Sequence, residues 1–258
     1  MRTLSSVSLA GLEPIGLSEL EAVAALLARQ DRKYIVPPAA LDELVAGLAR
    51  HARALEIDGS RTFRYESVYF DTPSLDAYRA AAHGRPRRFK VRTRSYLDSD
   101  VCLLEVKTRA RNGMTLKHRH PYSMEDRDRL TGQGLVFLSR FHGVADVTAE
   151  LRPVLTTAYR RTTLFDSASD SRITIDTDLV CSTPEGSTVG LSDVALVETK
   201  SAHGPTAVDR RLWASRIRPV RVSKYATGLA AIRDDLPSNR WRPVLQRHFP
   251  SPLSDVGG

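Results

Sequence analysis

The chain has 258 residues, of which 41% are hydrophobic and 26% charged; this composition excludes a wholly disordered protein and allows a core without disulfides or metal. Its 38 Lys and Arg residues outnumber its 30 Asp and Glu residues, giving a formal net charge of +8 and a pI near 9.8. This balance favours an anionic partner, whether nucleic acid, acidic membrane or a phosphorylated small molecule.

The first part of the chain alternates predicted helices with predicted strands. Ser18 and Glu21 form a capping box ahead of the first helix, and Thr72 precedes a helix that starts at Pro73. In order, we predict a tail at 1–16, helix 18–27, strand 31–36, helix 39–55, strand 63–71, helix 73–84 and a β-meander over 87–122.

The second part is richer in strands. We predict a mostly helical stretch at 124–141, strands at 147–165, 172–181 and 194–200, helices at 208–217 and 223–236 with Ser223 as a cap, and an irregular tail at 237–258 that packs through Trp241. One domain over 17–236 is the favoured organisation.

The cysteines, the N-terminal residues and the apolar stretches indicate where the protein is located. Cys102 and Cys181 lack zinc-site spacing and lie in apolar surroundings, so we expect two buried free thiols. No secretory signal is visible, and no apolar stretch approaches the roughly 18 residues that span a bilayer. We therefore expect a cytoplasmic protein without a membrane segment.

Charge recurs at alternate positions of several predicted strands. Because successive side chains of a strand point to opposite faces, Lys90, Arg92 and Arg94 share one face. The same spacing groups Glu105, Lys107 and Arg109; Lys117 and Arg119; Tyr159 and Arg161; Arg172, Thr174, Asp176 and Asp178; and Glu198 and Lys200. One interpretation is a sheet whose charged face lies in water. The other is an inward-facing barrel around an anion, where interleaved carboxylates would hold a bridging Mg²⁺ or Mn²⁺.

Nine short motifs carry a family resemblance. They are Asp-Arg-Lys-Tyr at 31–34, Ser-Val-Tyr-Phe-Asp-Thr at 67–72, Lys-Val-Arg-Thr-Arg-Ser-Tyr at 90–96, Leu-Glu-Val-Lys at 104–107, Lys117, Tyr-Arg-Arg at 159–161, Arg-Ile-Thr-Ile-Asp at 172–176, Glu-Thr-Lys at 198–200 and Ser-Lys-Tyr at 223–225. Each is weak alone, but their order and spacing are specific. In these motifs the chain resembles the VTC polyphosphate polymerase domain of the triphosphate tunnel metalloenzymes, relatives of the CYTH proteins.

The resemblance implies an α+β fold in which a closed antiparallel β-barrel of about eight strands forms a tunnel, with helices packed outside. It implies a VTC-like tunnel domain over 17–236, between the two tails. It also implies a set of phosphate-binding residues, of which all but Lys90, Lys117 and Tyr159 would be catalytic: Lys33, Lys90, Arg92, Arg94, Lys107, Lys117, Tyr159, Arg161, Arg172, Lys200 and Lys224. Glu198 would hold the divalent metal, Mn²⁺ or Mg²⁺, with Glu105 as a helper.

The expected activity is transfer of the γ-phosphoryl of a nucleoside triphosphate, with ATP as the expected donor, to a polyphosphate chain. Phosphoryl transfer requires positioning and charge neutralisation, which cations and a metal supply. Arg29 stands where hydrolytic CYTH relatives have the first Glu of an ExExK pattern, which favours the polymerase branch. No SPX domain is visible.

Three alternatives stay open: a triphosphatase on the same scaffold, a non-catalytic polyphosphate-binding module, and nucleic-acid binding. The last is the weakest, because aromatic residues make up 7% of the chain and do not interleave with the basic runs. Among other residues, Asp71 and Thr72 are expected to cap a helix, and Asp176 and Asp178 to be structural. His118 and His120 should lie on the face opposite Lys117 and not bind metal.

Overall fold

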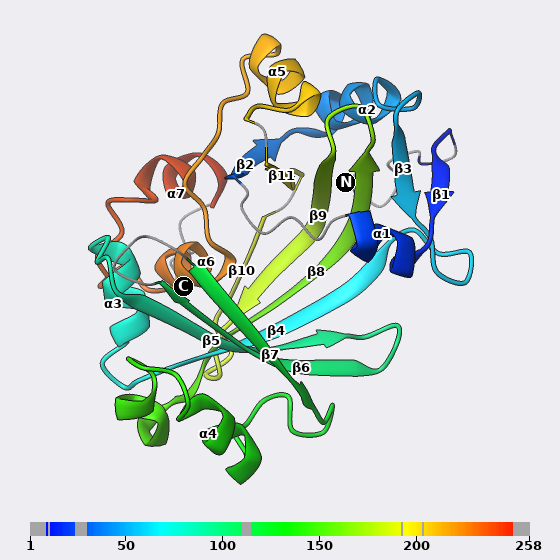
Figure 1. Ribbon diagram of the computed structural model, residues 1–258. Coiled ribbons are helices and arrows are strands. Elements are labelled where there is room, and N and C mark those ends of the chain that lie inside the picture. The colour runs from blue at the N-terminus through cyan, green and yellow to red at the C-terminus, as the bar shows by residue number, and fades with distance from the viewer. Residues whose placement is uncertain are drawn as a thin grey trace, which may run out of the picture. The chain divides into compact units, whose positions relative to one another are not determined.

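The computed structural model describes residue 9 and residues 11–23, 30–109, 115–191, 193–202 and 204–249. Within them the fold is of the α+β class and contains mostly antiparallel strands together with helices (Figure 1). The chain divides into two compact units, which are treated separately. The first contains the described parts of Met1–Phe63, Tyr159–Leu179 and Leu191–Arg221, and the second those of Arg64–Ala158, Val180–Gly190 and Val222–Gly258.

The strands of the first unit place charged residues opposite one another. In the antiparallel register, Glu198 lies opposite Lys33 on one side and opposite Thr174 on the other. The hydrogen-bonded order is β2, β11, β9 and β8, with β3 also paired to β8 and β1 paired in parallel to β3. Their bounds are β1 (Glu13–Ile15), β2 (Gln30–Val36), β3 (Ala52–Leu55), β8 (Arg152–Asp166), β9 (Ser171–Ser182) and β11 (Ala195–Ser201); β8 and β9 continue into the second unit.

Helices α1 (Leu17–Val23), α2 (Pro38–Ala46) and α5 (Ala207–Ala214) complete the first unit. Leu41 and Leu44 of α2 pack with strand residues in one apolar core. The predicted helix 39–55 is wrong beyond Ala46, since Gly47 ends α2 and the chain enters β3 at Ala52.

The second unit confirms the predicted β-meander. Four strands pair in chain order, each antiparallel to the next: β4 (Phe63–Asp71), β5 (Arg88–Tyr96), β6 (Val101–Arg109) and β7 (Thr115–Tyr122). The short β10 (Thr188–Leu191), which the sequence analysis did not predict, pairs with β9.

The helices of the second unit are α3 (Asp76–Ala82), α4 (Gly132–Leu138), a 3₁₀ helix (Ala145–Glu150), α6 (Lys224–Ile232) and α7 (Arg242–His248). Phe137 and Leu138 of α4 pack on the apolar face of the meander, against Val91, Leu104 and Val106. Two predictions are corrected: the helical stretch at 124–141 contains α-helix only in α4, and the strand predicted from 147 begins at 152, after the 3₁₀ turn.

Both predicted tails contain structure. Strand β1 falls within 1–16, because its backbone pairs with β3. Helix α7 falls within the stretch predicted to be irregular; Pro243 occupies its first turn, where proline is tolerated. Trp241 is buried, as expected.

The closed barrel is not confirmed. In the described residues, strand pairing ends at β2 in the first unit and at β7 in the second. Both cysteines are buried and free, as predicted. None of the helices in the described ranges is long and apolar enough to cross a membrane.

Candidate functional site: two charged sheet faces

The second unit carries a dense array of cations on one face of β5, β6 and β7. Strand alternation sends apolar residues of β5 and β6 to the α4 side and charged ones to the other. Cross-strand pairing aligns the charges in rows: Lys90 with Lys107 and Lys117, and Arg92 with Glu105 and Arg119. We call this array the basic face; it consists of Arg88, Lys90, Arg92, Arg94, Glu105, Lys107, Arg109, Lys117 and Arg119.

Glu105 is the carboxylate at the centre of the basic face. Its side chain is 2% exposed, and Arg92 Nη2 lies 2.6 Å from Oε2 while Lys117 Nζ lies 2.5 Å from Oε1. Arg119 and Arg94 lie 3.3 and 4.0 Å from the same carboxylate. Burial alone would raise the pKa of Glu105, but Arg92, Arg94 and Lys117 outweigh it and hold that pKa well below its ordinary value. Glu105 is therefore ionised and balances its neighbours.

Lys117 responds to the same crowding in the opposite direction. Burial, followed by repulsion from Arg92 and Arg94, lowers the pKa of Lys117 to about 7, although Glu105 opposes the shift. A bound anion would favour its charged form.

A chain of contacts holds Arg92 in place. Its Nη1 donates to the Tyr69 hydroxyl at 3.1 Å, and the Tyr69 ring stacks on Tyr225 with centroids 5.0 Å apart. The Tyr225 hydroxyl donates to Asp71 Oδ2 at 2.5 Å. Two predicted motifs therefore contribute support: Asp71 and Tyr225 are buried and tie α6 to the strand that precedes α3.

The start of α6 lies next to the basic face. As predicted, the Ser223 side chain caps the helix by accepting from Ala226 N, and it also accepts from Lys90 Nζ at 2.7 Å. Lys224 is the first residue of α6. The N-terminal end of this helix, where backbone N–H groups favour anions, thus adjoins Lys90.

The first unit has a smaller charged face on β2, β11 and β9. Lys200 lies opposite Asp31 and Arg172, one row from the Lys33–Glu198 pair, and Lys200 Nζ is 3.4 Å from Glu198 Oε1. Lys33, Arg172, Glu198 and Lys200 are all partly exposed.

Arg161 and Asp176 form a buried ion pair in the first unit. The contact is bidentate, with Arg161 Nε and Nη2 at 2.6 and 2.8 Å from the two carboxylate oxygens, and the guanidinium lies 5.2 Å from the Tyr159 ring centroid. Asp176 is structural, as expected. Asp178 departs from the predicted alternation, because its φ of 53° turns it towards Arg160, 3.8 Å away.

The side of this sheet that faces α5 is organised by Asp209, which the sequence analysis did not single out. Asp209 Oδ1 accepts from the Tyr34 and Thr199 hydroxyls at 2.6 and 2.8 Å. It also completes the α5 capping box with Thr206. Tyr34 and Thr199 adjoin Lys33 and Glu198 in sequence and point to the other face. Tyr34 and Thr199 therefore help to position Lys33 and Glu198. In the sequence, only the capping pattern of Thr206 and Asp209 could have indicated that Asp209 has a structural role.

The carboxylates of the two charged faces differ in how well they fit a divalent metal. No group of three His, Cys, Asp or Glu side chains able to hold an ion occurs in the described ranges. Glu198, partly exposed and beside Lys33 and Lys200, fits a metal that arrives with substrate phosphates, since Mg²⁺ commonly takes one or two protein carboxylates. Glu105 fits less well, because both of its oxygens already face cations.

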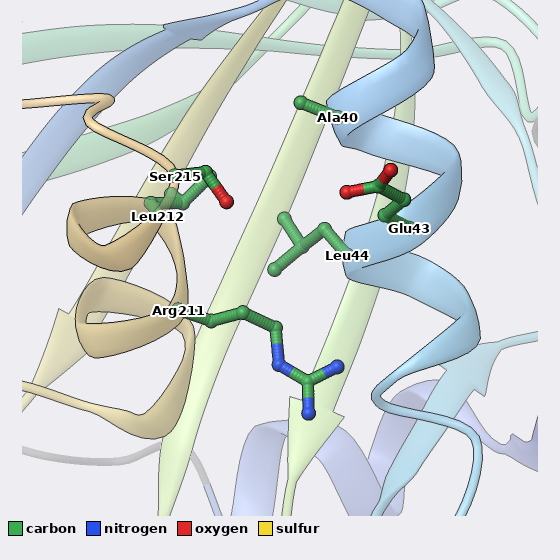
Figure 2. A pocket seen from close by; sticks show the side chains of 6 residues that line it. All are labelled: Ala40, Glu43, Leu44, Arg211, Leu212 and Ser215. Carbon is green, nitrogen blue, oxygen red and sulfur yellow. The ribbon is translucent and has the colours of Figure 1, made fainter.

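The predicted residues thus fall into two groups. The second unit brings together Lys90, Arg92, Arg94, Glu105, Lys107, Lys117 and Lys224, and the first brings together Lys33, Tyr159, Arg161, Arg172, Glu198 and Lys200. His118 and His120 lie on the opposite face from Lys117, against Phe141 and Phe137. A cavity of about 220 Å³ between α2 and α5 contains none of the predicted residues; it is lined by Ala40, Glu43, Leu44, Arg211, Leu212 and Ser215 (Figure 2).

Comparison with known proteins finds similar solved structures and one matching family. A Hippeastrum protein described as an adenylyl cyclase candidate with a dominant triphosphatase activity has a similar fold, with a TM-score of 0.52, 15% identity, and coverage of 80% of this chain and 97% of its own. A Pyrococcus horikoshii OT3 protein aligns with a TM-score of 0.47 and 12% identity over 80% and 98% of the two chains. No curated protein matches this sequence. The VTC domain family matches residues 28–233, most of the chain, and this protein belongs to that family.

Proposed function

We propose that this protein is a metal-dependent polyphosphate polymerase that transfers the γ-phosphoryl of a nucleoside triphosphate, with ATP as the expected donor, to a polyphosphate chain. The observation that carries the proposal is the basic face, where Arg92, Arg94, Lys117 and Arg119 lie within 4.0 Å of Glu105. Like charges in adjacent strand positions repel, and a polyphosphate anion would offset that repulsion. Membership of the VTC domain family supports the same substrate class.

The proposed roles follow from the surroundings of each side chain. Arg92 and Arg94 are planar donors suited to two phosphate oxygens at once, and Lys90, Lys107, Lys117 and Lys224 supply point charges. In the first unit Lys33, Arg172 and Lys200 would bind phosphate, while Arg161 orients Tyr159. Glu198 would hold the Mn²⁺ or Mg²⁺, which when bound supplies charge neutralisation for phosphoryl transfer. The closed, tunnel-forming barrel is part of this proposal.

Polymer synthesis tests the proposal directly. Purified protein incubated with ATP and Mn²⁺ should yield polyphosphate that resolves as a ladder on a gel. Glu198→Gln should abolish synthesis while leaving polyphosphate binding intact, and Glu43→Gln, which changes an exposed carboxylate of α2, should leave synthesis unchanged. Absence of polymer with several nucleotides, primers and metals would reject the polymerase.

A triphosphatase is the second candidate, because the Hippeastrum protein of similar fold is described as having a dominant triphosphatase activity. Release of orthophosphate from tripolyphosphate without chain growth would identify it. Tight polyphosphate binding with no turnover, unaltered by Glu198→Gln, would identify a binding module instead.

A further inference from the structure

The basic face continues beyond the residues assigned to the triphosphate. Past the row formed by Lys90, Lys107 and Lys117, the next cross-strand pair on the same face of β5 and β6 is Arg88 with Arg109. Both arginines lie on the same face as Lys90 and Lys107, two residues further along each strand. The cations therefore form a continuous track.

A third arginine approaches this end of the track from another part of the second unit. The Arg240 guanidinium covers Gly84, where an added Cβ would lie 2.0 Å from Nη1. Gly84 has a φ of 67°, so the position favours glycine on both conformational and steric grounds. Arg88 Nη1 donates to the Arg85 carbonyl, next to Gly84. The three guanidiniums of Arg88, Arg109 and Arg240 thus gather where the chain enters β5.

Arg88 is close enough to the other two arginines to be affected by their charges. Burial lowers the pKa of Arg88, and the charges of Arg109 and Arg240 lower it further. Bringing cations together costs free energy in the absence of a ligand, and an anion with several charges would recover it. A guanidinium group can bind two phosphate oxygens through two parallel N–H donors. A cluster of arginines therefore suits a ligand that carries several phosphates.

We propose that Arg88, Arg109 and Arg240 form an outer subsite for linear polyphosphate, which binds the part of the chain that extends beyond a triphosphate on the basic face. The inference rests on the proposed function, because it assigns the polymer and not the triphosphate to this cluster. The subsite would make the protein prefer long chains over tripolyphosphate.

Binding of two probes separates the subsite from the rest of the basic face. Calorimetric titrations with tripolyphosphate and with long-chain polyphosphate, without nucleotide, compare the full chain with the Arg109→Gln/Arg240→Gln variant. We expect the variant to lose about tenfold in affinity for long-chain polyphosphate, since charge-assisted contacts are lost, and to change less than about twofold for tripolyphosphate. Arg140→Gln, which removes an exposed cation beyond α4, is the matched control and should change neither affinity.

The outcomes distinguish the inference from the proposed function. Equal loss of affinity for both probes, or no loss for either, would overturn the outer subsite and leave the proposed function standing. Failure of the unmodified protein to bind tripolyphosphate would reject the proposed function and the subsite together. Displacement of long-chain polyphosphate by equal charge concentrations of single-stranded DNA would overturn the assignment to polyphosphate. If the double variant unfolds, Arg109→Gln alone gives the same comparison.

Discussion

At the scale of single residues, Glu105 explains how so many cations can share a folded sheet face. Its carboxylate is buried and faces Arg92 on one oxygen and Lys117 on the other. Removing one member of a buried charged group leaves the others uncompensated. Glu105 is thus a counter-charge that keeps the face ordered before a substrate arrives, which is a different role from the metal binding that the family resemblance implies.

Replacing Glu105 with Gln should therefore destabilise the ligand-free protein by about 2–3 kcal/mol. The carboxylate has a pKa well below its ordinary value, so its contribution is present above pH 4.5 and is lost as the pH falls below that towards the folded-state pKa. Urea unfolding of the two proteins at pH 7 and at pH 4 measures both statements, and the difference should shrink at the lower pH.

Glu66→Gln is the matched control for this change. Glu66 pairs with Arg127 at 3.1 Å in the same unit, but both side chains are more exposed, so less than about 1 kcal/mol should be lost. Equal destabilisation by the two substitutions would show that Glu105 has no special role. Recovery of the Glu105→Gln protein by added polyphosphate would support the counter-charge account.

Lys117 should make anion binding dependent on pH. Because its pKa is lowered from 10.5 to about 7, the free folded protein carries it mostly neutral at pH 8, while a bound phosphate favours the ammonium form. We expect uptake of close to one proton on tripolyphosphate binding at pH 8, and affinity that falls with rising pH above 7. Calorimetry in buffers with different ionisation enthalpies measures the uptake.

Lys117→Gln separates this proton from those of the ligand. The variant should bind tripolyphosphate more weakly than the unmodified protein at pH 7. At pH 8 it should take up about one proton fewer on binding. The lowered pKa of Lys117 also predicts that its contribution to the free energy of unfolding of the ligand-free protein rises as the pH increases from 7 to 10.5. In that range the unfolded chain holds the proton and the folded protein has released it. Identical proton uptake by both proteins would exclude Lys117 as the titrating group.

At the scale of elements, Asp71 joins two helices to one strand. Its oxygens accept from Ala77 N and Tyr78 N at the start of α3, both at 2.9 Å, and from the Tyr225 hydroxyl of α6. Asp71→Asn would place an amide donor against these donors, so we expect a loss of about 3 kcal/mol in the free energy of unfolding. Urea titration measures it.

Tyr225→Phe isolates one of those contacts. It removes a single hydroxyl and keeps the ring that stacks on Tyr69, so about 1–2 kcal/mol should be lost. In the double variant the effects should be less than additive, because both substitutions remove the same hydrogen bond. Full additivity would contradict the direct contact.

The elements with alternating charge were the most predictable. Strands β9 and β11 and the meander lie within two residues of their expected bounds, because period-two patterning is a local signal. The predicted end of the helix that starts near residue 39 was wrong because the composition after Ala46 continues to favour a helix. Gly47 is the only local signal that the helix stops there. Strand β10 has four residues, too few for a pattern to emerge.

At the scale of the whole molecule, long-range support was beyond the reach of the sequence. The contact of Tyr34 with Asp209 spans 175 positions and that of Tyr225 with Asp71 spans 154. Local patterns could place charged residues on strand faces. They could not reveal that neighbouring motif residues form buried hydrogen bonds to distant parts of the chain and so hold those strands and helices in place. The family resemblance supplied the list of motif residues, and the structure divides it into residues that face a ligand and residues that hold them.

A polyanion that binds the folded protein but not the unfolded chain stabilises the folded protein. At about one hundred times its dissociation constant, polyphosphate should add about 2.7 kcal/mol of stability, or about 5–10 °C in Tm. Lys200→Gln in the first unit and Arg94→Gln in the second test the two units separately, and each substitution should reduce this shift by weakening the charged face of its own unit. Sulfate at matched ionic strength controls for general salt effects. A substitution that leaves the shift unchanged would show that the charged face of its own unit does not bind the polyanion.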